Sequence, residues 1–128
     1  MGAKRPTGAS RRRRSMARRD LRRGDIRWYR FSAPDKRRPV LVLGGQSLLR
    51  SPDQIPVIPF STQIRGLPWE VVLSGSEGLG VDSALKPEWI RSLSARELGP
   101  WICGFPPQRW DEVRLAVLRV LGLDIALD

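Results

Sequence analysis

The chain has 128 residues, enough for one domain with a single hydrophobic core. It contains 23 Lys and Arg, 13 Asp and Glu and no histidine, which excludes imidazole general bases, Ser-His and Cys-His nucleophile pairs and His-containing zinc sites. Residues 1–24 hold ten of the basic residues and one acid, so the remainder, with 13 basic and 12 acidic residues, is nearly neutral.

Residues 1–22 combine arginine runs with Ser, Gly, Ala and Pro, and this composition predicts a disordered basic tail. The tail is either a solubilising or misassigned extension, since Met16 could be the true start, or a weak RNA-binding arm. No apolar run of signal-peptide length precedes Asp25, and Arg119 and Asp124 interrupt the apolar stretch 115–127. With a lone cysteine, Cys103, these features predict a cytoplasmic protein without a membrane segment.

Short strands are predicted from residue 25 onward. Residues 25–31 partly alternate, residues 32–36 have turn chemistry, and the apolar run 39–43 indicates a buried strand that pairs with the first. Residues 47–51 suggest a helical turn. Residues 54–61 suggest a third strand that Pro56 and Pro59 should push to an edge or a bulge.

Three further strands are predicted at 69–73, 83–86 and 101–104, with a flexible glycine-rich loop at 74–80. Pro107 then opens a helix that runs to Gly122, with apolar residues at helical spacing. Five or six short strands and one helix predict a mainly β, α+β domain: a small β-barrel closed by a C-terminal helix.

Phosphodiester chemistry is one interpretation of the polar residues at the strand ends. RNA cleavage without histidine or metal needs a group that neutralises charge on phosphorus, and an arginine fork does this best, so Arg38 is the leading candidate. Ser61, at the end of the third strand, could donate to phosphate or orient the 2′-hydroxyl, and Thr62 competes for that role. Alternatively, Arg38 is a solvated edge residue and Ser61 a turn-forming serine.

A carboxylate between two cations is the next candidate. Glu88 lies between Lys86 and Arg91, where it could steer their side chains or accept a proton, although a surface salt bridge is the alternative. The spacing of the acids predicts no metal cage, and Gly75, Gly78 and Gly80 match no phosphate-binding loop.

Six short motifs, in order, resemble those of the MazF/PemK (Kid) toxins of bacterial type II toxin–antitoxin systems. The resemblance runs from Arg22 to Leu123, on Arg23-Gly24-Asp25-Ile26, Arg38-Pro39-Val40-Leu41-Val42, Ile58-Pro59-Phe60-Ser61-Thr62-Gln63, Gly80-Val81-Asp82-Ser83-Ala84-Leu85, Ile90-Arg91 and Leu121-Gly122-Leu123. It implies an SH3-like β-barrel with a C-terminal helix over residues 23–128. It also implies a homodimer.

The same resemblance implies a metal-independent, cofactor-free and sequence-specific endoribonuclease that blocks translation. Such an enzyme cuts single-stranded RNA to 2′,3′-cyclic phosphate and 5′-hydroxyl ends. The family's catalytic arginine falls on Arg38, its strand-end hydroxyl on Ser61 and an acidic residue on Glu88. This chain departs from many relatives, which carry Thr at Ser61 and Asp at Glu88.

A cognate antitoxin is implied as a partner, inserting an acidic and apolar tail across the RNA groove. The predicted RNA-binding residues of that groove are Arg27, Lys36, Arg37, Arg65 and Lys86, with Trp28, Thr62 and Gln63. Two alternatives stay open: a non-catalytic toxin of the same fold that binds a protein such as a topoisomerase, and a degenerate member that binds RNA without cutting it.

Overall fold

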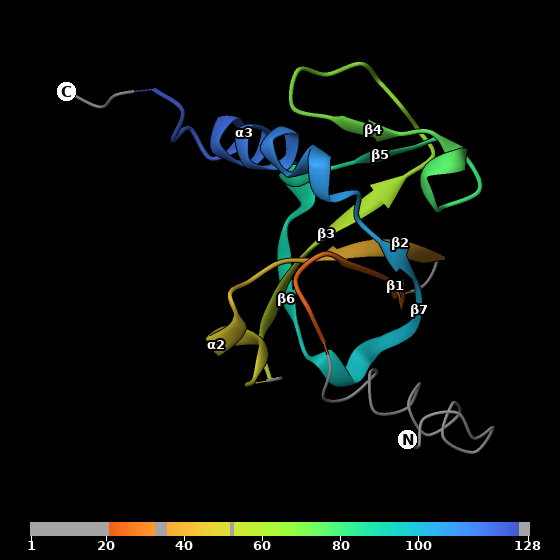
Figure 1. The fold of residues 1–128 in the computed structure, drawn as a ribbon, viewed down its shortest axis with the longest axis vertical. Helices are drawn as coiled ribbons and strands as arrows, with labels where there is room; N and C mark the ends of the chain where they lie inside the picture. The colour runs from red at the N-terminus through yellow and green to blue at the C-terminus, as the bar shows by residue number, and fades with distance from the viewer. Residues whose placement is uncertain (1–20, 33–35, 52, 126–128) are drawn as a thin grey trace.

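The computed structural model describes residues 21–32, 36–51 and 53–125 (Figure 1). Seven strands, β1 (Asp25–Arg30), β2 (Arg37–Val42), β3 (Ile55–Ser61), β4 (Val71–Leu73), β5 (Ser83–Leu85), β6 (Arg91–Leu93) and β7 (Leu98–Gly104), form one antiparallel sheet. Its helices are α2 (Gln46–Leu49) and α3 (Trp110–Val120). The mainly β fold with a C-terminal helix is therefore confirmed.

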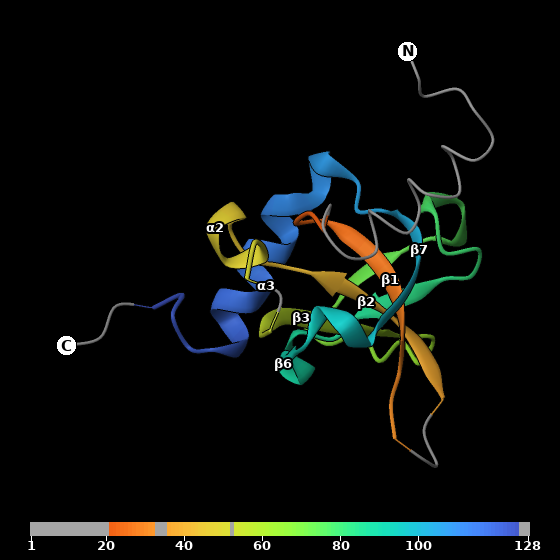
Figure 2. The same cartoon turned by 90° about the horizontal axis from the view of Figure 1, so that it is seen from below.

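The β1–β2 hairpin carries the first elements of the site. Its register pairs Trp28 with Pro39 and Tyr29 with Arg38, so the predicted pairing of these strands is confirmed. Alternation sends Tyr29 into one core and Ile26 into the other, because successive side chains on a strand point to opposite faces. Figure 2 shows the end of β1 and the start of β2 extending away from α2 and α3.

Strand β3 is central rather than at an edge, so the expectation based on its prolines is wrong. It pairs with β2, with β6 over residues 55–57 and with β5 over residues 60–61. The carbonyl of Pro59 accepts from the Lys86 amide at 2.9 Å, so its missing N–H faces the place where β6 gives way to β5. The proline thus falls in a gap between two ladders and costs the sheet no hydrogen bond.

Two hydrophobic cores lie on the two faces of the sheet. The first includes Tyr29, Val40, Val57 and Leu93, and the second includes Phe60, which packs with the buried face of α3. Figure 1 shows α3 beside β4 and β5, and α2 at the opposite end near β6. As predicted, Pro107 starts the C-terminal helix, here as a 3-10 turn, η4 (Pro107–Arg109), before α3 begins.

The expected barrel is not closed. The strand order is β4-β5-β3-β2-β1-β7, with β6 on β3, and no ladder in the described part of the chain joins β6 to β7. The two strands are connected covalently by the 3-10 turn η3 (Ala95–Glu97), so the sheet curls back at this turn. Strand β6 was not predicted, and β7 begins at Leu98 rather than at Trp101.

The basic tail predicted for residues 1–22 lies almost entirely outside the described residues. Of its last two residues, Leu21 is 4% exposed and belongs to the first core, so ordered packing begins at least there. Within the described residues, every helix is too short or too polar to cross a bilayer.

Candidate functional site

A cavity of about 450 Å3 lies at the turn end of the β1–β2 hairpin. Seven predicted site residues line it: Trp28, Lys36, Arg37, Arg38, Ser61, Thr62 and Gln63. The remaining lining comes from Pro39, Phe60, Leu79 and Val81, which give it an apolar floor, and from Ser83. Residues that are distant in sequence thus meet because the end of β3 lies beside the start of β2.

Arg38 lies half-buried near the start of β2. It shares a face with Val40, and its guanidinium carbon lies 5.6 Å from the centre of the Trp89 ring. Trp89 is 41% exposed and ends the 3-10 turn η2 (Pro87–Trp89). A cation over an aromatic face is attracted by the ring quadrupole, so Trp89 restrains the Arg38 side chain at the rim of the cavity.

Ser61 is 6% exposed at the end of β3. Its Oγ accepts a hydrogen bond of 3.0 Å from the backbone N–H of Gln63. The turn-forming geometry considered for this serine is therefore present. That bond uses Oγ only as an acceptor, which leaves the hydroxyl hydrogen to donate to a ligand oxygen.

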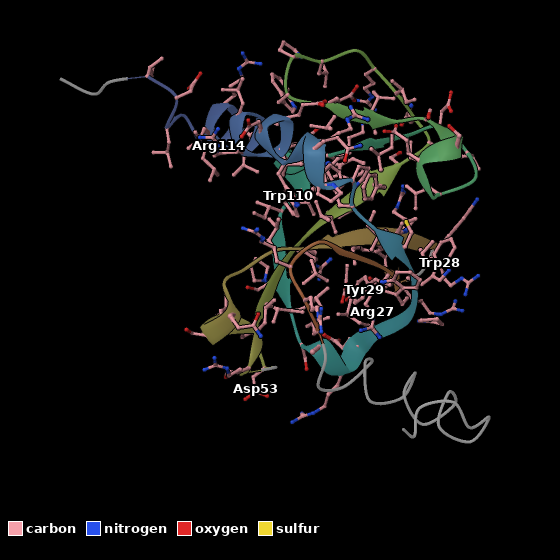
Figure 3. All side chains as sticks on the ribbon, viewed as in Figure 1. Arg27, Trp28, Tyr29, Asp53, Trp110 and Arg114 are labelled. Carbon is pink, nitrogen blue, oxygen red and sulfur yellow. The ribbon has the colours of Figure 1, made fainter. Side chains whose placement is uncertain are left out.

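An aromatic platform and exposed polar groups form the rest of the rim. The guanidinium carbon of Arg37 lies 4.5 Å from the centre of the Trp28 ring, and Figure 3 shows Trp28 on β1 beside Tyr29. Thr62 and Gln63 are exposed, and the Gln63 side chain accepts a 3.5 Å contact from Arg65. Arg65 itself does not line the cavity.

Two of the cations predicted to bind RNA, Arg27 and Lys86, are buried and make contacts within the protein. Arg27 is 1% exposed, and its Nε donates to the carbonyl of Gly99 at 3.0 Å. Burial lowers the pKa of Arg27, and the nearby Asp25 opposes this effect. Lys86 is 2% exposed and forms an ion pair with Glu70. Long cations are buried in this way when a partner satisfies them.

Glu88 is exposed on η2 and does not line the cavity. Among residues 21–32, 36–51 and 53–125, it forms no ion pair, because Lys86 is taken by Glu70 and Arg91 lies over the Tyr29 and Phe31 rings. The surface salt bridge considered for Glu88 is therefore absent from the described structure. Glu88 is adjacent in sequence to Trp89, the ring that Arg38 contacts.

Sequence reasoning missed the wall of the cavity supplied by residues 74–82. This segment was expected to be a flexible loop, but it forms a capped 3-10 turn, η1 (Gly75–Glu77). The Gly75 amide donates to Asp82 at 2.8 Å, and Glu77 accepts from Arg109 at 2.9 Å. Leu79 and Val81, which line the cavity, belong to this segment. The capping-box pattern from Ser74 to Glu77 was the sequence signal that could have predicted an ordered turn here.

The arrangement suits an extended anion that carries flat rings. Arg37, Arg38 and Lys36 supply positive charge at the rim, Ser61 and Thr62 supply hydroxyl groups, and Trp28 offers a face for stacking. A phosphodiester with splayed bases presents these features together. In the described residues, no three His, Cys, Asp or Glu side chains gather as a set of metal ligands.

Comparison with known proteins shows that the chain is similar to toxins of type II toxin-antitoxin systems. The family profile described as "PemK-like, MazF-like toxin of type II toxin-antitoxin system" matches residues 22–121. The Mycobacterium tuberculosis toxin MazF-mt6 is similar with a TM-score of 0.71 at 25% identity, covering 79% of this chain and 99% of that chain.

Two further structures contain antitoxin partners. A chain of MazE-MazF from Deinococcus radiodurans has a TM-score of 0.66 at 28% identity, covering 79% of this chain and 95% of that chain. A mycobacterial endoribonuclease in complex with its cognate antitoxin has a TM-score of 0.70 at 19% identity, covering 81% and 97%, and supports the fold alone. The search of curated proteins gave no match.

Proposed function

The chain belongs to the PemK/MazF family of type II toxin–antitoxin toxins, and we propose that it is an endoribonuclease acting on single-stranded RNA. The proposed reaction needs no metal ion or cofactor. It leaves 2′,3′-cyclic phosphate and 5′-hydroxyl ends and thereby blocks translation. The active domain is proposed to be residues 23–128, an SH3-like fold acting in the cytoplasm.

The observation that carries the proposal is that Arg38 and Ser61 line one cavity although 23 positions separate them. In the proposed reaction, the 2′-hydroxyl gives up its proton as its oxygen attacks phosphorus, the bond to the 5′-oxygen breaks, and that oxygen takes up a proton from water. Arg38 neutralises the charge that develops on the phosphoryl oxygens, and the Ser61 hydroxyl donates to one of them. Glu88, next to the Trp89 ring that Arg38 contacts, is the proposed proton acceptor.

RNA binding is proposed to use the rim of the cavity. Bases stack on Trp28, which Arg37 already flanks, and phosphates lie along Lys36 and Arg37. Thr62, Gln63 and Arg65 supply polar groups that contact base edges from the loop after β3. These exposed side chains replace Arg27 and Lys86 as the proposed contacts.

A cognate antitoxin and a second copy of the chain are the proposed partners. An acidic and apolar antitoxin segment fits the cationic rim and apolar floor of the cavity, and the similar Deinococcus radiodurans structure is named as MazE-MazF. For the homodimer, support comes from exposed apolar side chains in the middle of α3 and at its C-cap, where Leu115 is 43% and Leu121 51% exposed.

The decisive test is cleavage of a long single-stranded RNA in EDTA, with the new ends mapped. Wild type should cut and leave 5′-hydroxyl ends, and Arg38→Ala should lose about 100-fold or more in rate, as expected when a transition-state donor is removed. Arg50→Ala is the matched control, because Arg50 is exposed and lies outside the cavity lining. It should cut like wild type.

Other outcomes would reject the proposal. A folded wild type that leaves RNA intact is not an endoribonuclease. If Arg38→Ala also stays toxic in cells, the protein-target alternative gains support. Binding without cutting would instead favour the degenerate toxin.

A further inference from the structure

Glu70 is the least exposed carboxylate near the site, with its side chain 1% exposed. Three consecutive backbone N–H groups donate to its Oε1: Arg65 at 3.0 Å, Gly66 at 2.8 Å and Leu67 at 3.3 Å. Gly66 has φ +71°, which lets the chain turn so that the three N–H groups converge. Convergent backbone N–H groups of this kind bind anions, and here the anion is the protein's own carboxylate.

Lys86 completes the cluster from the other side. Its ammonium group pairs with Glu70, and its backbone N–H donates to the carbonyl of Pro59 at 2.9 Å. Burial alone raises the pKa of Glu70, but the hydrogen bonds from Lys86 and from the backbone N–H groups outweigh it and lower the pKa. The carboxylate is therefore held charged inside the fold.

The ion pair touches both walls of the proposed RNA site. Through residues 65–67, Glu70 fixes the loop whose first residues, Thr62 and Gln63, line the cavity. On the other side, the Lys86 ammonium lies 5.8 Å from the centre of the Trp89 ring, and the same ring lies 5.6 Å from the Arg38 guanidinium carbon. One buried pair thus connects the polar rim with the ring that restrains Arg38.

We propose that Glu70 and Lys86 are positioning residues, which set the geometry of the loop 62–67 and of the Trp89–Arg38 contact without touching RNA. This inference rests on the proposed function. It also gives Lys86 a positioning role, whereas the sequence alone predicted that Lys86 binds RNA directly. A charged pair at 1–2% exposure offers no surface to a phosphate, but it dictates where its neighbours lie.

Charge-neutralising variants separate positioning from contact. Glu70→Gln leaves the Lys86 charge buried and unpaired, and Lys86→Met leaves the Glu70 charge unpaired, so each should distort the site and lower RNA cleavage about 10- to 100-fold. In the double variant Glu70→Gln/Lys86→Met, both side chains are neutral and similar in size to the originals. It should recover cleavage to within about threefold of wild type, because residues in contact are coupled.

The control is Glu97→Gln, whose carboxylate likewise accepts a backbone N–H, from Ser94 at 3.1 Å, but lies outside the cavity lining. It should cut like wild type. The salt dependence of RNA binding should be unchanged in Lys86→Met, whereas loss of a phosphate contact lowers the slope by about 0.7 on single-stranded RNA. The proposal would be overturned if the double variant cleaved RNA as slowly as Lys86→Met and if Lys86→Met lowered the slope of log affinity against log salt by that amount.

A readout independent of cleavage keeps this test apart from that of the proposed function. Exchange of the Arg65, Gly66 and Leu67 amide hydrogens, followed by NMR, should be slow in wild type and in the double variant and faster in each single variant. Should wild type not cut RNA, the endoribonuclease proposal fails and the exchange rates still decide whether the pair holds the loop. Equal exchange in all four proteins would reject the inference.

Discussion

At the scale of single residues, the hydroxyl group of Ser61 has a structural role and a proposed catalytic role. Its Oγ closes a turn by accepting a hydrogen bond from the backbone N–H of Gln63. The hydrogen of the same hydroxyl group is the proposed donor to phosphate. Because the residue is 6% exposed, only a ligand that enters the cavity can reach it. The turn therefore depends on the oxygen of this hydroxyl group and the proposed chemistry on its hydrogen, and the two effects can be measured separately.

Ser61→Ala should lower both stability and activity. Loss of the acceptor leaves the Gln63 amide unsatisfied, which costs about 1 kcal/mol in the free energy of unfolding. Cleavage should fall further than stability explains, by about 100- to 1000-fold in kcat, the range for a lost transition-state donor. Urea unfolding and single-turnover cleavage measure the two effects on the same protein.

Ser61→Thr is the matched control, since it keeps the hydroxyl and adds one methyl group. It should retain most of the stability and most of the cleavage rate. A folded Ser61→Ala that cuts as fast as wild type would assign Ser61 to the turn alone.

Residue identities predicted Arg38 and Ser61, but they could not predict which cations are buried. Arg27 and Lys86 look like groove residues in sequence, because a cation near a strand end is normally exposed. The partner of Lys86 is Glu70, 16 positions earlier, and nothing local links the two. Only the pairing of β4 with β5 brings them together, so no local pattern predicts this ion pair.

At the scale of elements, one arginine ties the wall of the cavity to the C-terminal helix. Arg109 donates to Glu77 in the turn η1 at 2.9 Å and to Glu112 on α3 at 2.6 Å. The backbone N–H of Ser74 and the Arg109 guanidinium lower the pKa of Glu77, and Arg109 lowers the pKa of Glu112. The segment that carries Leu79 and Val81 is therefore held by charge as well as by packing.

This arrangement predicts how acid affects stability. The ordinary pKa of a glutamate is 4.5, and in the folded state the pKa of Glu77 lies below it. The stabilisation from Glu77 is thus fully present above pH 4.5 and is lost as the pH falls through the folded pKa. Glu77→Gln should be less stable than wild type at pH 7, and the difference should shrink below pH 4.5.

Urea unfolding of both proteins between pH 7 and pH 3 measures that difference in the free energy of unfolding. The contributions of the other titrating groups are the same in both proteins and cancel in the difference. A difference in the free energy of unfolding that is the same at every pH would contradict the role given to Glu77.

Most elements were predictable, and the failures have local causes. The strands β1, β2, β3 and β5 and the helix α3 follow apolar patterning and proline positions within a few residues. Strand β6 spans only Arg-Ser-Leu, too short for a pattern, and Gly99 and Pro100 hide the start of β7. The central place of β3 depends on which strands pair with it, and this is a property of the whole sheet.

At the scale of the whole molecule, positive charge is concentrated at one end of the chain. Residues 1–20 contain eight Lys and Arg and one Asp, so removing them takes the net charge from +10 to +3. The core of the described fold starts at Leu21, and the cavity lining starts at Trp28. Charge that contributes to general affinity for RNA can therefore be removed without altering the proposed site.

Residues 21–128 should therefore keep the cleavage sites of the full chain but bind RNA less tightly. Each phosphate contact contributes about 0.7 to the slope of log affinity against log salt for single strands, so the slope should fall in the shortened protein if the basic residues contact RNA. Filter binding across a salt series and end mapping on one RNA measure the two properties separately. An unchanged slope would show that the basic residues in 1–20 make no contacts with phosphates. Altered cleavage sites would show that residues 1–20 contribute to sequence recognition.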